Sequence, residues 1–159
     1  MSIRIAEDRD LSRIKDLLLQ VNNVHANGRP DIFIKDCMKY TDKEILDQLH
    51  DKKKVIFVYI NEEDVLLGYA FCQIKEYKNI NNVRPHKSIY IDDLCVDEKY
   101  RRQHIGQALL NHVEEYAKQN NFYSIELNVW ECNPSAKAFY EKMNMKPLKT
   151  EMEKIIREA

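Results

Sequence analysis

The segment from Arg101 to Ala108 has the residue types of an anion-binding helix start: it reads Arg-Arg-Gln-His-Ile-Gly-Gln-Ala. The first turn of a helix carries backbone N–H groups without intrahelical partners, and the helix dipole favours negative charge there. Small residues at Gly106 and Ala108 leave room for a bulky diphosphate to approach the backbone. These residues alone predict either an anion site or an ordinary helix start that two arginines flank.

Other kinds of site chemistry are disfavoured by the cysteines and glycines. The cysteines form no Cys-x-x-Cys pair and have no histidine at ligand spacing, so reduced thiols are expected rather than a metal site or a disulfide framework. The glycines, Gly28, Gly68 and Gly106, stand too far apart for G-x-G-x-x-G or G-x-x-x-x-G-K-[ST]. The dinucleotide-binding and Walker-type phosphate motifs are therefore excluded.

Length and charge limit the class of protein further. The chain has 159 residues, 44% of them hydrophobic, which predicts a single domain over 1–159 with a sizeable core. Its 25 Lys and Arg against 26 Asp and Glu argue against a nucleic-acid partner. No apolar run approaches the roughly 18 residues of a membrane span, and acidic residues interrupt the N-terminus, so we expect no membrane segment and a cytoplasmic location.

Hydrophobic periodicity predicts the elements that position these residues. We expect helices at about 11–21, 41–49, 106–117 and 134–143, with Asn133 capping the last one. We expect strands at 2–6, 55–60, 65–76, 88–96 and 122–130, and two more within 146–157. Residues 24–33 contain Gly28 and Pro30 and are predicted to form a loop. The order predicts an α/β fold: a mixed, mostly antiparallel, twisted sheet of about seven strands with helices on both faces.

Two stretches resemble conserved blocks of the GNAT acetyltransferase superfamily. Gln103-x-x-Gly106-x-Ala108 after a strand is similar to its acyl-CoA diphosphate loop, and the run from Asn133 to Lys142, Asn-Pro-Ser-Ala-x-x-Phe-Tyr-Glu-Lys, resembles its fourth block. The resemblance covers nearly the whole chain and is strongest over 88–145. It implies a single N-acetyltransferase domain that uses acetyl-CoA as co-substrate and no metal.

The resemblance also implies which residues bind the co-substrate. In the superfamily, the strand matching 90–96 splays from the strand matching 124–130, and the pantetheine arm lies in the gap. Many members have glycine where this chain has His104, which departs from the pattern. The expected co-substrate residues are Leu94, Cys95, Val96, Arg101, Arg102, Gln103, His104, Ile105, Gly106, Gln107, Ala108, Asn133 and Ala136.

Tyr140 matches the superfamily tyrosine that protonates the leaving thiolate. A hydroxyl with a pKa of about 10 can donate to a thiolate of similar basicity, and the N–H of Val96 or a neighbour would polarise the thioester carbonyl. Without the resemblance, Tyr140 would be interpreted as core packing. Cys95 has no adjacent base, so direct transfer in a ternary complex is expected rather than a covalent acyl-enzyme.

The acceptor side is predicted from carboxylates. An attacking amine must be neutral, so the site needs a base or a water chain. The stretch 90–94 resembles the matching strand of diamine and polyamine acetyltransferases, where a carboxylate, usually Glu, at the position of Asp92 serves the amine. Asp92 and Asp93 are adjacent in a strand and are expected on opposite faces. Glu126 is a second candidate, and each carboxylate could instead be solvated or structural.

The predicted loop 24–33 occupies the place where the superfamily covers its acceptor pocket. His25, Arg29, Asp31 and Phe33 have the mixed charge and aromatic surface of a small-molecule lid, and a solvated loop is the alternative. The predicted activity is acetyl transfer to a primary amine of a small molecule. The alternatives are a protein or peptide N-acetyltransferase and a non-catalytic acyl-CoA sensor. Family members often form homodimers, sometimes by exchange of the last strand, and Met152–Ile156 alternates suitably.

Overall fold

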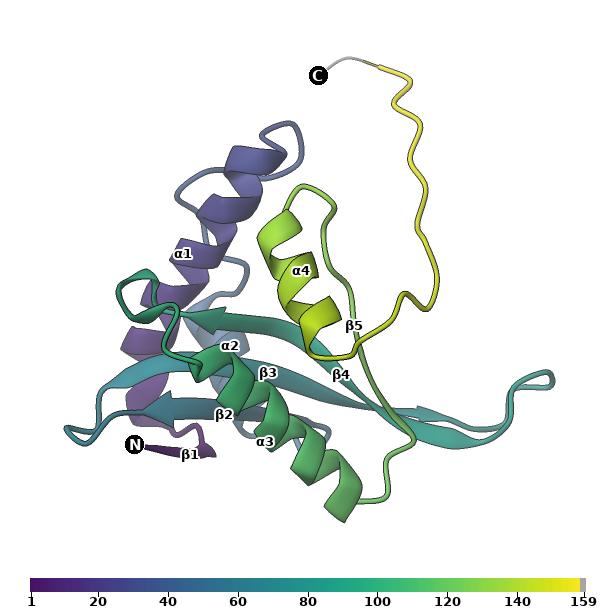
Figure 1. The fold of residues 1–159 in the computed structure, drawn as a ribbon, viewed down its shortest axis with the longest axis horizontal. Helices are drawn as coiled ribbons and strands as arrows, with labels where there is room; N and C mark the ends of the chain where they lie inside the picture. The colour runs from purple at the N-terminus through teal and green to yellow at the C-terminus, as the bar shows by residue number, and fades with distance from the viewer. Residues whose placement is uncertain (158–159) are drawn as a thin grey trace.

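The computed structural model describes residues 1–157 and contains one five-stranded sheet. The sheet order is β1-β2-β3-β4-β5, with antiparallel neighbours except for the parallel pair β4 and β5. Figure 1 shows the helices on both faces of this sheet. The elements are β1 (Ser2–Ile5), η1 (Asp8–Asp10), α1 (Leu11–Gly28), α2 (Asp42–Leu49), β2 (Lys54–Ile60), β3 (Leu66–Tyr77), β4 (His86–Val96), η2 (Glu98–Tyr100), α3 (Ile105–Gln119), β5 (Ser124–Leu127) and α4 (Pro134–Lys142).

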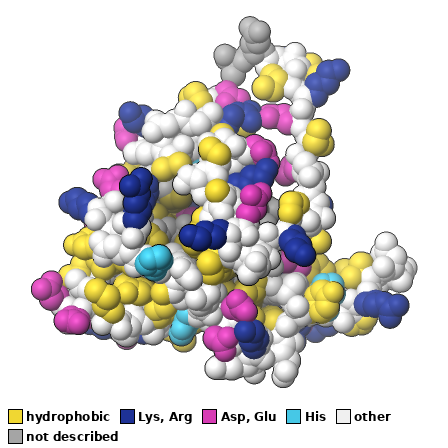
Figure 2. Space-filling view, in the orientation of Figure 1, with side chains coloured by type: hydrophobic (Ala, Val, Ile, Leu, Met, Phe, Trp, Pro, Cys, Tyr) yellow, Lys and Arg dark blue, Asp and Glu magenta, His cyan; other side chains and the backbone are white. Residues whose placement is uncertain are grey.

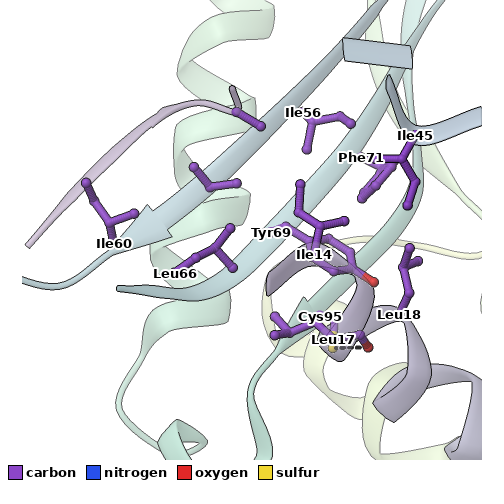
Figure 3. Packing of buried hydrophobic residues seen from close by; sticks show 12 residues of the cluster. Ile14, Leu17, Leu18, Ile45, Ile56, Ile60, Leu66, Tyr69, Phe71 and Cys95 are labelled. Carbon is purple, nitrogen blue, oxygen red and sulfur yellow. Dashed lines mark hydrogen bonds between the residues drawn. The ribbon is translucent and has the colours of Figure 1, made fainter. Parts of the chain in front are cut away.

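The core on one face of the sheet comes from the apolar stripes of α1 and α2. Ile14, Leu17 and Leu18 of α1 are fully buried at helical spacing, and they pack with Tyr69 and Phe71 of β3. Figure 3 shows these side chains meeting between the helix and the strands. The opposite face is covered by α3, with α4 packed beside it. Because each helix buries one stripe, the sheet is enclosed between two helical layers.

Helix α1 is longer than the sequence predicted. It continues through Gly28, so the predicted loop beginning at residue 24 was wrong at its start, and His25 lies in the helix. Polar residues in its last turns do not end it, because their side chains bind the chain that follows: Asn22 donates to the carbonyl oxygen of Ile34 at 2.8 Å, and Asn23 donates to Asp36 at 3.0 Å. These bonds hold the connection between α1 and α2 against the helix.

The sheet has five strands and not about seven, so that part of the prediction was wrong. Residues 146–157 form an exposed extended tail, and the predicted strand at 122–130 is reduced to Ser124–Leu127. Strands need a partner for their backbone groups, and the tail finds none within the described part of the chain. Figure 1 shows the tail running past α4 and away from the sheet.

Candidate active site

Strand β4 continues beyond the end of its partner β5, in agreement with the splay that the family resemblance implied. β4 pairs with β5 only from Ser88 to Ile91. Beyond this point Leu94, Cys95 and Val96 still pair with β3 on one side, but in the described chain they have no partner on the side of β5. The unpaired side exposes backbone donors and acceptors that an extended polar ligand can bind.

Gly68 allows this unpaired stretch to lie close to β3 and α3. A Cβ atom at Gly68 would lie 3.0 Å from the carbonyl oxygen of Cys95 and 3.2 Å from Leu109. A side chain at this position would therefore push the β4 backbone out of place. The glycine is required here by close approach, because its φ angle is not positive.

The start of α3 directs free backbone amides toward the same end of the sheet. The first helical hydrogen bond joins Ala108 N–H to the carbonyl oxygen of His104 at 2.9 Å, which leaves the N–H groups of residues 105–107 without intrahelical acceptors. Arg102 and His104 both have left-handed backbone conformations, with φ values of 64° and 60°. Such a turn before a helix aims several N–H groups at one point, a geometry that binds anions.

The position of His104 explains why glycine suits it. A non-glycine residue in the left-handed region is strained by about 1–2 kcal/mol. The imidazole lies exposed and contacts the side chain of Gln107 at 3.2 Å. The departure from the family pattern therefore costs backbone strain at the helix start and does not fill the anion site.

Helix α4 packs onto α3 through Gly106. A Cβ atom at Gly106 would lie 3.4 Å from the ring of Phe139, an ordinary van der Waals distance, so the two helices are in contact here without requiring a glycine. The predicted cap of α4 is confirmed, since Asn133 Oδ1 accepts from Ala136 N–H at 3.3 Å and Pro134 opens the helix. These contacts hold Tyr140, one residue after Phe139, at the edge of the core.

Tyr140 is half-buried, and its hydroxyl makes no hydrogen bond within the described residues. Burial raises the pKa of this phenol, and the charges of Asp93 and Cys95 raise it further. The hydroxyl therefore keeps its proton at neutral pH. It can act as a hydrogen-bond and proton donor beside the unpaired stretch of β4.

Asp92 and Asp93 lie on the same face of the sheet, so the prediction of opposite faces was wrong. Phe71 of β3 pairs with Asp93, while the next residue, Cys72, pairs with Ile91. Asp92 is thus an extra residue in β4, a β-bulge that interrupts the alternation of side chains. The bulge turns both carboxylates toward the α1 and α2 side.

The two carboxylates have separate partners. Asp92 accepts from the Tyr40 hydroxyl and lies 3.1 Å from Nζ of Lys39. Asp93 accepts from the Tyr69 hydroxyl at 2.9 Å. Burial raises the pKa of Asp93 to about 6, although the Tyr69 hydrogen bond and the Lys39 charge oppose this shift. Asp93 can therefore exchange a proton near neutral pH, a property that the sequence did not reveal.

Glu126 lies apart from this pair, in the short part of β5 that is paired with β4. Its carboxylate accepts from the hydroxyls of Tyr77 at 3.3 Å, Ser88 at 2.9 Å and Ser124 at 3.2 Å. Glu126 shares no hydrogen-bond partner with Asp92 in the described residues. Its contacts are those of a structural carboxylate.

The residues predicted as a lid divide into two groups. His25, Phe33 and Trp130 form a cluster of rings, with centroids 5.0 Å apart for Phe33 and Trp130 and 5.1 Å apart for His25 and Phe33. This cluster joins the end of α1 to the connection between β5 and α4. Arg29 instead binds Asp31 at 2.7 Å and Glu153 of the tail at 2.8 Å. The lid charges therefore neutralise one another.

A partly buried ion pair anchors the turn that leads to α3. Asp97 accepts from Arg13 of α1 and from the N–H of Lys99 at 3.0 Å, and Arg13 also donates to the carbonyl oxygen of Leu66 at 3.0 Å. Burial alone would raise the pKa of Asp97, but these hydrogen bonds outweigh it and lower the pKa. The sequence carries no signal for this contact because the two residues are far apart along the chain.

Cys95 is unsuited to act as a nucleophile. Its thiol is buried and donates to the carbonyl oxygen of Leu17 at 3.5 Å. Burial raises its pKa to about 12, so the reactive thiolate is scarce at neutral pH. Within residues 1–157, no group of three His, Cys, Asp or Glu side chains could hold a metal ion, and no helix is long and apolar enough to cross a membrane.

Comparison with known proteins connects this geometry to a family. N-alpha-acetyltransferase 50 of Danio rerio is 32% identical over 114 residues, 71% of this chain and 63% of that protein. Streptothricin acetyltransferase A of Bacillus subtilis is 30% identical over 105 residues, 65% of this chain and 55% of that protein. The chain thus spans less than two thirds of the length of these curated relatives.

A solved structure has nearly the same fold as this chain. A crystal structure of a variant of the BH1408 protein from Bacillus halodurans has a TM-score of 0.95 at 29% identity, covering 99% of this chain and 100% of that one. The model of the acetyltransferase (GNAT) family matches residues 18–145, most of the chain, which include the unpaired stretch of β4, the start of α3 and Tyr140. The chain belongs to the GNAT acetyltransferase family.

Proposed function

We propose that this chain transfers the acetyl group of acetyl-CoA to a primary amine of a small molecule, a diamine or polyamine, by direct attack in a ternary complex. The observation that carries the proposal is the meeting of three features at one end of the sheet: the unpaired stretch of β4, the free amides at the start of α3, and the protonated hydroxyl of Tyr140. Family membership supports acetyl-CoA as the co-substrate.

The residues present fit this co-substrate. The unpaired backbone of Leu94, Cys95 and Val96 would bind the amide-bearing pantetheine arm, and the amides and guanidinium groups between Arg101 and Ala108 would hold the diphosphate. Asn133 and Ala136 begin the helix that borders the same stretch. When bound, acetyl-CoA supplies an acyl thioester as the electrophile.

Two protein side chains would carry out the proton transfers of the reaction. Asp93 accepts the proton that the acceptor ammonium must lose, since its carboxyl titrates near neutrality. The amine nitrogen then forms the C–N bond as the C–S bond breaks, and Tyr140 gives its proton to the departing sulfur. The second proton, which the new amide nitrogen must lose, passes to the Tyr140 phenolate and restores its hydroxyl. The backbone N–H of Val96 polarises the carbonyl. Asp92 binds a cationic group of the acceptor.

The carboxylate pair and the ring cluster of His25, Phe33 and Trp130 support a small cationic acceptor with an apolar body. The similarity to streptothricin acetyltransferase A, named for a small molecule, agrees with this. The similarity to N-alpha-acetyltransferase 50 favours a second candidate, acetylation of a protein N-terminus. An acceptor panel containing diamines and N-terminal peptides distinguishes the two.

The test is thiol release from acetyl-CoA across that panel, beside Tyr140→Phe. The variant should lower kcat about 10²-fold with little change in the KM of acetyl-CoA, because only the proton donor is lost. Tyr123→Phe, at a tyrosine that is 81% exposed, is the matched control and should behave as wild type. Equal activity in Tyr140→Phe would remove its role. Saturable acetyl-CoA binding without turnover would indicate a sensor.

We also propose that the protein forms a homodimer by exchanging its tail. The outer edge of β5 has no strand beside it in the described chain, and the tail residues Leu148, Met152 and Ile156 are 77%, 85% and 81% exposed. In an extended chain these three lie on one face. Figure 2 shows hydrophobic side chains along the tail and a gap between the tail and the body. The tail of a second copy would pair with the open edge of β5 and bury its own apolar face there.

A further inference from the structure

The cation that faces Asp92 in this structure belongs to the protein itself. Lys39 Nζ lies 3.1 Å from Oδ1 of Asp92, and the neighbouring Tyr40 donates its hydroxyl to Oδ2. Both oxygens are therefore engaged by adjacent residues of the connection between α1 and α2. The carboxylate proposed to bind the acceptor already carries an ammonium group.

Lys39 is placed among the groups that would surround an acceptor. Burial raises the pKa of Asp93, and the Lys39 charge opposes that rise. Burial lowers the pKa of His25, and the Lys39 charge lowers it further. The Lys39 ammonium also lies 5.3 Å from the centre of the Tyr40 ring. An ammonium group thus lies against Asp92, and its charge acts on both Asp93 and His25.

The Lys39 ammonium can leave without unfolding the protein. The side chain is 45% exposed, and it stands in an irregular segment between two helices. An ion pair with this exposure is weak, so another cation can replace it. Tyr40, which stacks on Phe71 with ring centroids 5.9 Å apart, stays in the core and keeps Asp92 oriented.

We propose that Lys39 is an internal competitor of the acceptor: an acceptor ammonium group must displace Lys39 from Asp92 in order to bind. The proposal rests on the proposed function. A monoamine must lose its only positive charge before it attacks. It can then no longer hold Asp92, and Lys39 pairs with this carboxylate again. An acceptor with a second ammonium group keeps Asp92 occupied while its other nitrogen attacks. Lys39 therefore selects against acceptors with a single positive charge.

The test measures acetylation of two acceptors, a linear four-carbon diamine (tetramethylenediamine) and n-butylamine, by Lys39→Gln. At about pH 8, where Asp93 stays ionised without the Lys39 charge, the KM for the diamine should fall roughly three- to fivefold, the range of a partly exposed ion pair, with kcat unchanged. The ratio of kcat/KM for the diamine to kcat/KM for n-butylamine should fall. Lys43→Gln is the matched control, since Lys43 pairs with Asp47 at 2.7 Å on α2 and does not contact Asp92; it should leave both KM values unchanged.

A double variant isolates the competition. In an Asp92→Asn background, Lys39→Gln should no longer lower the KM for the diamine, because there is no charge for which the two cations compete. If Lys39→Gln alone raises this KM or leaves it unchanged, the proposal is wrong. A rise would identify Lys39 as a residue that binds an anionic part of the acceptor.

Calorimetry separates this proposal from the proposed function. Binding of tetramethylenediamine to the complex of the protein with CoA requires no turnover. Tighter binding of the diamine to Lys39→Gln than to wild type supports the competition, whether or not thiol is released. A lack of thiol release would overturn only the proposed activity. Equal or weaker binding, or no binding to either protein, overturns the competition.

Discussion

At the scale of single residues, the bulge in β4 decides which carboxylate can accept a proton. It turns Asp93 beside Asp92, where burial raises the pKa of Asp93 to about 6. Asp92 remains partly exposed and engaged by Lys39 and Tyr40. The geometry supports the proposed roles, in which Asp92 binds a cationic group of the acceptor and Asp93 accepts its proton.

This division predicts a pH dependence. If Asp93 is the base, kcat/KM for the amine should rise with pH up to about 6 and then level off, because the carboxyl must be ionised. Asp93→Asn should lower the plateau value of kcat/KM and remove the rise below about pH 6. Tyr69→Phe should move this rise to higher pH, since the Tyr69 hydrogen bond stabilises the ionised form. A rise that survives unchanged in Asp93→Asn would assign the base elsewhere.

The raised pKa of Asp93 also predicts how the stability of the protein changes with pH. A carboxyl whose pKa is higher in the folded state than its unfolded value of about 3.9 holds its proton more tightly when folded. The free energy of unfolding should therefore decrease as pH rises from about 4 to about 6 through this group. Thermal melts of wild type and Asp93→Asn over this range isolate this group: the Tm of wild type relative to that of Asp93→Asn should fall as the pH rises.

At the scale of elements, the anion site depends on how the turn between β4 and α3 is held. Asp97 links this turn to α1 through Arg13, and Arg13 also binds the chain at the start of β3. Three elements thus share one ion pair. We expect this anchor to hold the turn that precedes the left-handed residues and the free amides of α3.

Breaking the anchor should weaken co-substrate binding and stability together. Arg13→Met leaves a buried carboxylate without its guanidinium partner and should lower the free energy of unfolding by about 2–3 kcal/mol, measured by urea denaturation. It should raise the KM of acetyl-CoA more than that of the amine. Arg9→Met, which removes an exposed ion pair with Glu7 and Asp64, should leave the urea midpoint unchanged. An unchanged midpoint in Arg13→Met would show that the anchor contributes nothing.

At the scale of the whole molecule, we propose that the tail decides whether two copies of the chain assemble. Residues 146–157 leave α4 as an extended segment that touches the rest of the chain through the ion pair of Arg29 with Glu153. An exposed apolar face of this kind on a free strand is a site for association. The open edge of β5 offers the matching surface.

Light scattering at two concentrations tests the assembly. Wild type should give twice the chain mass of 19.0 kDa. The double variant Met152→Lys, Ile156→Lys should give the single chain mass, because two charges on the apolar face oppose its burial. Glu151→Lys, on the opposite face of the extended tail, is the control and should remain dimeric. A wild-type protein at the single chain mass would refute the exchange.

The sequence by itself determined the local structure and the co-substrate side. Periodicity located the four helices, and residue types specified the cap of α4 at Asn133. Resemblance to the family added the splay of β4 from β5, which the strand pairing confirms. Each of these features depends on neighbours in the chain or on a conserved block, so a linear pattern can record it.

The tertiary structure alone decided the acceptor side and the tail. The face on which Asp93 lies depends on the register between β3 and β4, and one extra residue reverses it. The pairs of Lys39 with Asp92 and of Arg13 with Asp97 join distant parts of the chain, so no local pattern encodes them. The last residues alternate like a strand, but a strand forms only where a second edge lies beside it, and in the described chain the tail has none.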